Sequence, residues 1–128
     1  MIKAYLAGIA SQYEAEDIEV RYSIYEDEEL LSKEAIWLDY QKPAIVGLIA
    51  LRTLLQKLEK HRGKEILIMI NDAALNEIIR GTSTTKNIDV LQKARETRVE
   101  LLRFGDCVIK DISGEREELV KWQEIFQP

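Results

Sequence analysis

Asp72 is the residue of this sequence that is best placed to carry chemistry. It follows residues 65–70, which after Glu65 are all apolar, as is typical of a central strand covered on both faces. An acid near the carboxyl end of such a strand lies where α/β proteins often hold functional groups. Carboxylate oxygens suit hard divalent cations, so Asp72 is a candidate metal ligand.

The same position also has a purely structural interpretation. Residues 72–80 have the pattern of a short helix that Gly81 would end. Asn71 and Asp72 stand where the strand turns into this helix, and either side chain can accept a hydrogen bond from a backbone N–H of its first turn. Capping is the simpler expectation for Asp72, and metal binding is the alternative.

A second candidate segment, residues 86–89, has the sequence Lys-Asn-Ile-Asp and opens a predicted helix. Asn87 and Asp89 can cap that helix. Cations that could neutralise the phosphates of a nucleic acid begin in this segment and continue along the helix; they are Lys86, Lys93, Arg95 and Arg98. The alternative is a solvated face on which some of them pair with Glu96 and Glu100.

Other common catalytic and cofactor motifs are absent from the sequence. It has no phosphate-binding glycine loop, no G-x-G-x-x-G, no C-x-x-C and no serine nucleophile elbow. The single cysteine, Cys107, excludes an intramolecular disulfide and is expected to be a small core residue. Without a signal peptide or a membrane span, the expected location is the cytoplasm.

The elements that would position these residues begin with three strands. Residues 2–10, 18–25 and 30–37 have strand character, and the second of these alternates most regularly. Their short connections predict an antiparallel meander with the acidic residues 26–29 at a hairpin tip. Gly8 either weakens the first strand or marks a close approach of another backbone.

A long helix is expected at the centre of the molecule, from Pro43 to about residues 61–63. Its first half has almost no polar face, so it should be buried between other elements. Two helices, a strand at residues 107–112 and a last helix capped by Ser113 would follow the central strand. We expect Trp37, Tyr40 and Trp122 in the core or at its edge.

The predicted order β-β-β-α-β-α-α-β-α indicates a single α/β domain spanning residues 1–128. Three meandering strands followed by two strands that each come after a helix imply a mixed five-stranded sheet with helices on its faces. The 128 residues suffice for a sizeable core.

Charge is distributed unevenly along the chain, whose formal net charge is −5. Residues 1–40 carry three basic and ten acidic side chains, whereas residues 41–128 carry fifteen basic and thirteen acidic ones. The first third is therefore a poor surface for phosphates, and any contact with nucleic acid has to come from the remainder.

This element order resembles type 1 ribonuclease H and the wider ribonuclease-H-like fold over nearly the whole chain. Residues 86–93 resemble the K-N-x-D-L segment that opens a helix in the bacterial members. Residues 70–81 are similar to the strand–T-D-S–helix passage that holds a catalytic aspartate, and residues 115–119 are a weaker match to an E-R-x-D-E-L run.

The resemblance implies cleavage of the RNA strand of RNA–DNA hybrids by two divalent cations that four carboxylates hold. Asp72 matches the third carboxylate, and Glu117 stands near the fourth if a gap is allowed. The first carboxylate falls on Ala7, and the second falls near Pro43 or Ala44, none of which can bind a metal through its side chain.

Replacement acids have structural interpretations of their own. Glu117 is favourable in the first turn of a helix because of the helix dipole. Asp39 is expected to be solvated and Asp111 to be a turn or cap residue, and no spacing argument brings either to Asp72. The histidine loop of the family is absent, since His61 is the only histidine and lies elsewhere.

The sequence therefore predicts a ribonuclease-H-like domain without nuclease activity that binds nucleic acid or a protein partner, with no cofactor and no membrane. A homo-oligomer is also allowed. In the family the 86–93 segment lies near the substrate groove, so the expected nucleic-acid contacts are Lys86, Asn87, Asp89 and Lys93. The alternative is a divergent hybrid nuclease that uses Mg²⁺ or Mn²⁺ with Asp72 and Glu117 as catalytic residues.

Overall fold

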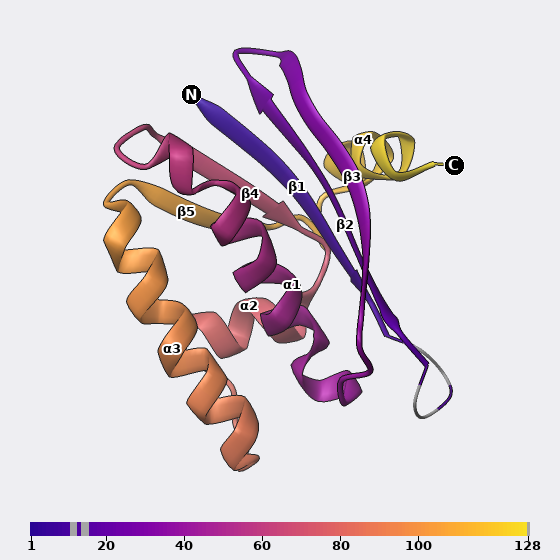
Figure 1. Ribbon diagram of the computed structural model, residues 1–128, viewed down its shortest axis with the longest axis vertical. Helices are drawn as coiled ribbons and strands as arrows, with labels where there is room; N and C mark the ends of the chain where they lie inside the picture. Colours follow the sequence, from indigo (N-terminus) through magenta and orange to yellow (C-terminus); the bar gives the residue numbers. More distant parts are fainter. Residues whose placement is uncertain (11–12, 14–15, 128) are drawn as a thin grey trace.

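The computed structural model describes residues 1–10, 13 and 16–127, whose five strands form one mixed sheet in the order β3-β2-β1-β4-β5 (Figure 1). The strands are β1 (Ile2–Ile9), β2 (Ile18–Glu26), β3 (Glu29–Leu38), β4 (Ile66–Ile70) and β5 (Cys107–Asp111). The β1–β2 and β2–β3 pairs are antiparallel, whereas the β1–β4 and β4–β5 pairs are parallel. The predicted mixed α/β architecture is confirmed.

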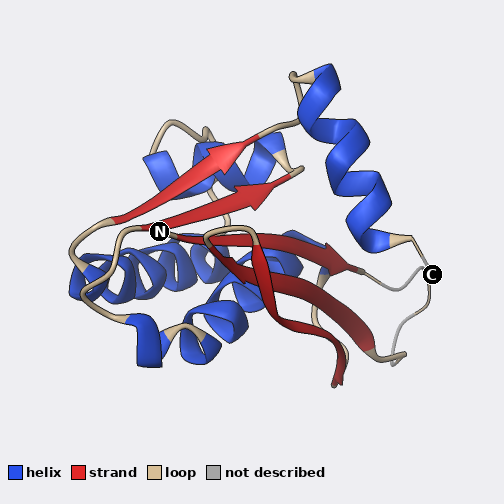
Figure 2. Cartoon of the chain, turned by 90° about the horizontal axis from the view of Figure 1, so that it is seen from above, coloured by secondary structure: helices blue, strands red, loops and turns tan. Residues whose placement is uncertain are grey.

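Helices cover both faces of this sheet. They are α1 (Pro43–Lys57), α2 (Ala73–Arg80), α3 (Ile88–Phe104) and α4 (Arg116–Phe126), with a short 3₁₀ helix η1 (Glu59–His61) after α1. The α1, α2 and α3 helices share the larger apolar core with one face of the sheet, and α4 packs against the other face. Figure 2 shows α4 across the strands from α1 and α3. No helix in the described part of the chain has the length and apolar character of a membrane span.

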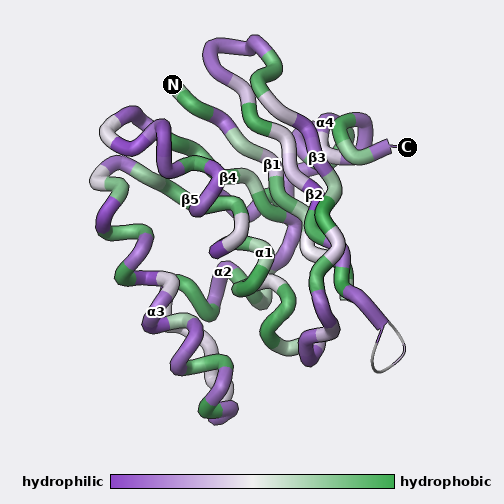
Figure 3. The backbone as a smooth tube through the Cα atoms, viewed as in Figure 1, coloured by the Kyte–Doolittle hydropathy of each residue, from purple (hydrophilic) through white to green (hydrophobic). Residues whose placement is uncertain are grey.

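The central helix α1 is buried, as its composition predicts, and both α1 and β4 are mostly hydrophobic in Figure 3. It lies close to β1, because a Cβ atom on Gly8 would be only 3.0 Å from the Cβ of Ala50. Gly8 therefore marks a close approach of the helix to the strand. The helix ends at Lys57, earlier than predicted, and the tighter turn of η1 then places His61 in the core with 8% of its surface exposed.

Helix α3 presents a different face to the core than its apolar spacing suggests. Five residues near helical spacing predict this helix in the sequence, and in the structure all five are exposed: Ile88, Leu91, Arg95, Val99 and Leu102. Its buried side chains are Val90, Ala94, Thr97 and Phe104. Three of these, Val90, Ala94 and Thr97, are small, which suits close contact with α1. At the edge of this contact, Arg52 of α1 donates to Glu96 at 3.0 Å and to Glu100 at 3.4 Å. These acids therefore join two helices and do not pair with cations of α3.

Three local predictions are corrected by the structure, and the acidic hairpin is confirmed. Trp37 is 64% exposed on the edge strand β3 and not in the core. Ser113 does not cap α4, whose N-cap is Glu115; its hydroxyl instead donates to Asp111 Oδ2 at 2.7 Å. Cys107 is only half-buried, although burial raises the pKa of its thiol to about 11.

Candidate functional site

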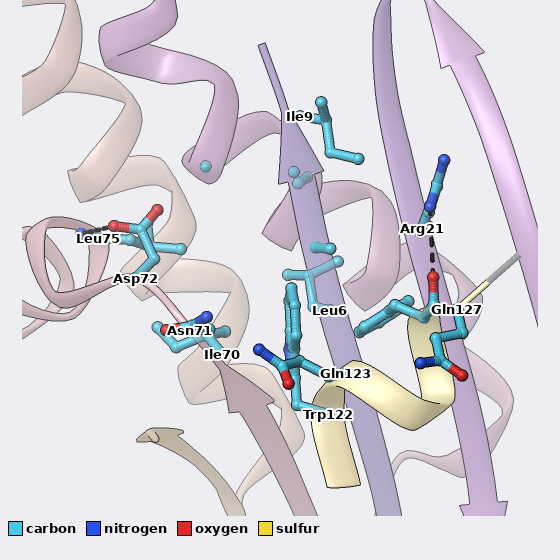
Figure 4. A pocket seen from close by; sticks show the side chains of 15 residues that line it. Leu6, Ile9, Arg21, Ile70, Asn71, Asp72, Leu75, Trp122, Gln123 and Gln127 are labelled. Carbon is cyan, nitrogen blue, oxygen red and sulfur yellow. Dashed lines mark hydrogen bonds between the residues drawn. The ribbon is translucent and has the colours of Figure 1, made fainter. Parts of the chain in front are cut away.

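A hollow of about 500 Å³ lies at the carboxyl ends of β1 and β4 (Figure 4). These strands are parallel neighbours in the sheet. The strand order changes direction between them, because β2 lies beside β1 toward one edge of the sheet and β5 lies beside β4 toward the other edge. Open α/β sheets hold their ligands at such a switch point. The volume is in the range of sites for small ligands, so this hollow is the candidate site.

Asp72 lies on the rim of the hollow and caps α2. Its Oδ1 atom accepts a hydrogen bond from the backbone N–H of Leu75 at 2.9 Å, and its backbone is extended. The capping interpretation is therefore confirmed. One carboxylate oxygen is used by the helix, which leaves Oδ2 as the atom for any further contact.

The residues of β1 and α1 that line the hollow carry no charge, and most of them are small. Ala7 and Gly8 line the hollow from β1, and Gly47 and Ala50 line it from α1. A Cβ atom on Gly47 would lie 3.2 Å from Asp72 Oδ2. The helix position that faces Asp72 is therefore Gly47, and neither β1 nor α1 supplies a second carboxylate there.

Asp111 is the acid that the structure brings to Asp72, which the sequence did not predict. Its Oδ1 atom accepts from the backbone N–H of Asp72 at 3.2 Å and from that of Ser113 at 3.1 Å. Asp111 is thus a turn residue, as expected, and it also accepts a hydrogen bond from the backbone of Asp72. Within the described ranges, no group of three or more His, Cys, Asp or Glu side chains is arranged to hold a metal ion.

Glu117, the other candidate catalytic acid, lies exposed in the first turn of α4. The α4 residues that line the hollow come instead from the later turns of the helix and from the residue after it: Trp122, Gln123, Phe126 and Gln127. The structure therefore does not place Glu117 with Asp72 in the lining of the hollow.

The 86–93 segment lies at the end of α3 that is remote from β5 (Figure 1). None of its residues lines the hollow. Asn87 caps the helix, since its Oδ1 atom accepts from the backbone N–H of Asp89 at 3.0 Å and of Val90 at 3.3 Å. Lys86 and Asp89 are exposed and Lys93 is half-buried. Capping explains Asn87 structurally and leaves the two lysines without a comparable structural role.

The cations of α3 differ in what they contact. Arg98 donates to the backbone carbonyls of Ile79 at 3.0 Å and Ile78 at 2.7 Å, so it holds α3 to α2. Among the residues that the structure describes, Lys86, Lys93 and Arg95 form no ion pair. The basic stripe that remains free for phosphates is therefore shorter than the sequence suggests.

Sequence reasoning missed the contributions of β2 and α4 to the hollow. Arg21 of β2 lines it, with its guanidinium bonded to Glu19 Oε1 at 2.7 Å and to the Phe126 carbonyl at 3.5 Å. A charged residue between Val20 and Tyr22 in a strand with an apolar face was the available signal. Gln123 and Gln127 gave no such signal in the sequence, because polar residues at these positions are ordinary on a helix surface.

Solved structures similar to this one include ribonucleases H. LC11-RNase H1, isolated from compost by a metagenomic approach, has a TM-score of 0.79 at 15% identity, over 97% of this chain and 91% of that chain. LC11-RNase H1 in complex with an RNA/DNA hybrid has a TM-score of 0.76 at 17% identity, over 98% of this chain and 93% of that chain. RNase H1 from the halophilic archaeon Halobacterium salinarum has a TM-score of 0.77 at 18% identity, over 91% of this chain and 89% of that chain.

The chain has the ribonuclease-H-like fold. No protein-family model matches the sequence, and no curated protein is similar to it in sequence. The ribonuclease-H-like fold is therefore established by the arrangement of its elements, and function has to be argued from the residues of the hollow and of α3.

Proposed function

We propose that this ribonuclease-H-like domain binds nucleic acid and does not cleave it. The observation that carries the proposal is the lining of the hollow, to which β1 and α1 contribute no carboxylate. Ala7 and Gly8 line it from β1, and a Cβ atom on Gly47 of α1 would lie 3.2 Å from Asp72 Oδ2. Two-metal hydrolysis needs several carboxylates around two cations that lie about 4 Å apart. One carboxylate that also caps a helix does not supply this ligand set.

Nucleic acid is favoured as the partner by two observations. LC11-RNase H1 has been seen in complex with an RNA/DNA hybrid, and this chain has the same fold. In addition, Lys86, Lys93 and Arg95 of the α3 region are not neutralised by ion pairs within the described residues. The net charge of −5 opposes this binding, so the affinity should be modest and should depend strongly on salt.

Removing two of these lysines tests the proposal. We expect the double variant Lys86→Ala/Lys93→Ala to bind a fluorescein-labelled nucleic acid more weakly, because two phosphate contacts are lost. Anisotropy titrations over a series of salt concentrations should show the slope of log K against log[salt] reduced by about 2, roughly one for each contact. The probe is an RNA–DNA hybrid with a single-stranded RNA overhang.

The matched control is Lys33→Ala/Lys121→Ala, which removes the same charge from exposed positions in β3 and α4. Its salt slope should equal that of the unmodified protein. Equal losses in both double variants would show that binding follows net charge alone and would contradict a site on α3. If the unmodified protein does not bind the probe at low salt, the proposal is wrong, and the protein partner expected from the sequence becomes the function to test.

A divergent metal-dependent nuclease is the second candidate, because Asp111 lies next to the Asp72 backbone. Two neighbouring carboxylates can bind one divalent cation more easily than one can. Titration calorimetry with Mn²⁺ would then show a site that is lost in Asp72→Asn and in Asp111→Asn and kept in Glu117→Gln. We expect no such site, because Asp72 Oδ1 is held by α2 and both oxygens of Asp111 accept bonds in the Asp111–Ser113 turn.

A further inference from the structure

The lining of the hollow is suited to a flat apolar group. Trp122 and Phe126 form one wall and pack edge-to-face, with ring centroids 4.7 Å apart. Leu6 and Ile9 of β1 and Ile70 of β4 form other apolar walls. The small residues Ala7, Gly47 and Ala50 keep the space open. Aromatic and aliphatic walls around a volume of about 500 Å³ favour a ring system of limited size.

Charges in the lining favour neither an anion nor a cation. The positive charge of Arg21 is opposed by Glu19, whose Oε1 atom lies 2.7 Å from Arg21 Nε. Asp72 is the other charged residue among those that line the hollow, and it would repel a phosphate. A group that enters the hollow should therefore be uncharged.

Carboxamides supply the directional contacts in the hollow. Asn71 at the end of β4 and Gln123 and Gln127 on the α4 side line it and can be followed in Figure 4. Within the described chain, their side chains take part in no hydrogen bond. A carboxamide offers a donor and an acceptor side by side, which is the group that pairs with the edge of a nucleobase.

We propose that this hollow receives a single unpaired nucleobase. The proposal rests on the proposed nucleic-acid function and specifies it: the base inserts against the Trp122–Phe126 wall and its edge bonds Asn71 and Gln123, while the phosphates stay outside. Proteins that recognise single strands commonly stack a base on an aromatic side chain and bond its edge. A base held in a duplex cannot enter, so single-stranded nucleic acid is the preferred class.

Tryptophan fluorescence provides a direct test, because the chain has two tryptophans and Trp37 lies exposed on β3. In a Trp37→Phe protein, Trp122 is the only fluorophore of its kind. Adenosine and adenosine 5′-monophosphate should quench it saturably with affinities within about threefold of each other, because the phosphate adds little. Ribose 5-phosphate should have no effect.

In the same background, Asn71→Ala/Gln123→Ala should weaken adenosine binding about tenfold or more, since the edge contacts are lost. The control Gln56→Ala removes an exposed carboxamide from α1 that does not line the hollow and should bind adenosine unchanged. Circular dichroism shows that each variant is folded. Quenching by ribose 5-phosphate equal to that by adenosine, no quenching by adenosine at millimolar concentration, or unchanged binding in the double variant would each overturn the proposal.

Anisotropy with a labelled single-stranded RNA separates this inference from the proposed function. RNA binding that depends on Lys86 and Lys93 but not on Asn71 and Gln123 overturns the nucleobase site and leaves the nucleic-acid function in place. Failure of the RNA to bind overturns both, whether or not free adenosine binds. Loss of RNA binding in Asn71→Ala/Gln123→Ala, with Gln56→Ala unaffected, supports both.

Discussion

At the scale of single residues, Asp72 has a structural role that can be measured separately from any chemistry. Its Oδ1 atom caps α2 by accepting from Leu75 N–H. Because asparagine caps helices about as well as aspartate, Asp72→Asn should keep most of the stability, whereas Asp72→Ala should lose about 1 kcal/mol. Urea unfolding at unchanged m-value measures the difference.

The control for this comparison is Asp39→Ala, which removes an exposed acid that forms no hydrogen bond or ion pair in the described chain. Its stability should be close to that of the unmodified protein. Equal destabilisation in Asp72→Asn and Asp72→Ala would show that the negative charge, and not the cap, matters at this position.

His61 makes the stability of the protein depend on pH. Burial, with Lys64 and Lys60 nearby, lowers the pKa of its imidazole below the ordinary value of 6.5, and its Nε2 atom is buried without a hydrogen-bond partner among the described residues. The unfolded chain therefore binds a proton more readily than the folded one. Stability from this group is present above about pH 6.5 and is lost as the pH falls, by at most about 1.4 kcal/mol per pH unit.

Replacing His61 by leucine should remove this dependence. The free energy of unfolding of the unmodified protein should then fall more steeply between pH 7 and pH 5 than that of His61→Leu, when both are measured by denaturant titration. Parallel curves for the two proteins over this range would contradict the assignment, since every other titrating group is shared.

At the scale of elements, the close approach of α1 to β1 fixes the shape of the hollow. A methyl group on Gly8 would lie 3.0 Å from the Cβ of Ala50. Gly8→Ala should therefore destabilise the protein by about 1–3 kcal/mol through overpacking. In the double variant with Ala50→Gly, the loss should be smaller than the sum of the two single losses, because the added methyl group then has room. Additive losses in thermal or urea unfolding would show that the contact between positions 8 and 50 does not cause the destabilisation.

The elements were largely predictable from the sequence because each carries its own periodicity. The alternation in β2, the continuous apolar runs of α1 and β4, and the glycines that end α2 and α3 are local signals. The wrong details depend on contacts between elements: which face of α3 meets α1, the exposure of Trp37 on an edge strand, and the 3₁₀ turn that buries His61.

The candidate site was less predictable, because it is assembled from five separate segments. The position of Asp72 at the end of a buried strand pointed to the correct edge of the sheet. In the sequence, Gly47 is recognisable only as one residue of a predicted helix. Its approach to Asp72 depends on how that helix packs. Arg21 gave one weak local signal, whereas nothing local indicates that α4 closes the hollow.

At the scale of the whole molecule, the ribonuclease-H-like sheet separates two surfaces that the proposals use differently. Free cations lie along α3, on the helix layer of the sheet, whereas the hollow opens at the carboxyl ends of the central strands and is closed by α4. A nucleic acid whose phosphates follow the first surface would have its unpaired base recognised at the second. In our proposal the molecule uses these two surfaces together to bind nucleic acid.

The most direct test of that account is to ask whether bound nucleic acid stays intact. An RNA–DNA hybrid with a single-stranded RNA overhang, labelled on the RNA, is incubated with excess protein in Mg²⁺ and separately in Mn²⁺, and is then run on native and denaturing gels. We predict a shifted complex on the native gel and full-length RNA on the denaturing gel. RNA cleavage that appears with the unmodified protein and disappears with Asp72→Asn would contradict the central claim.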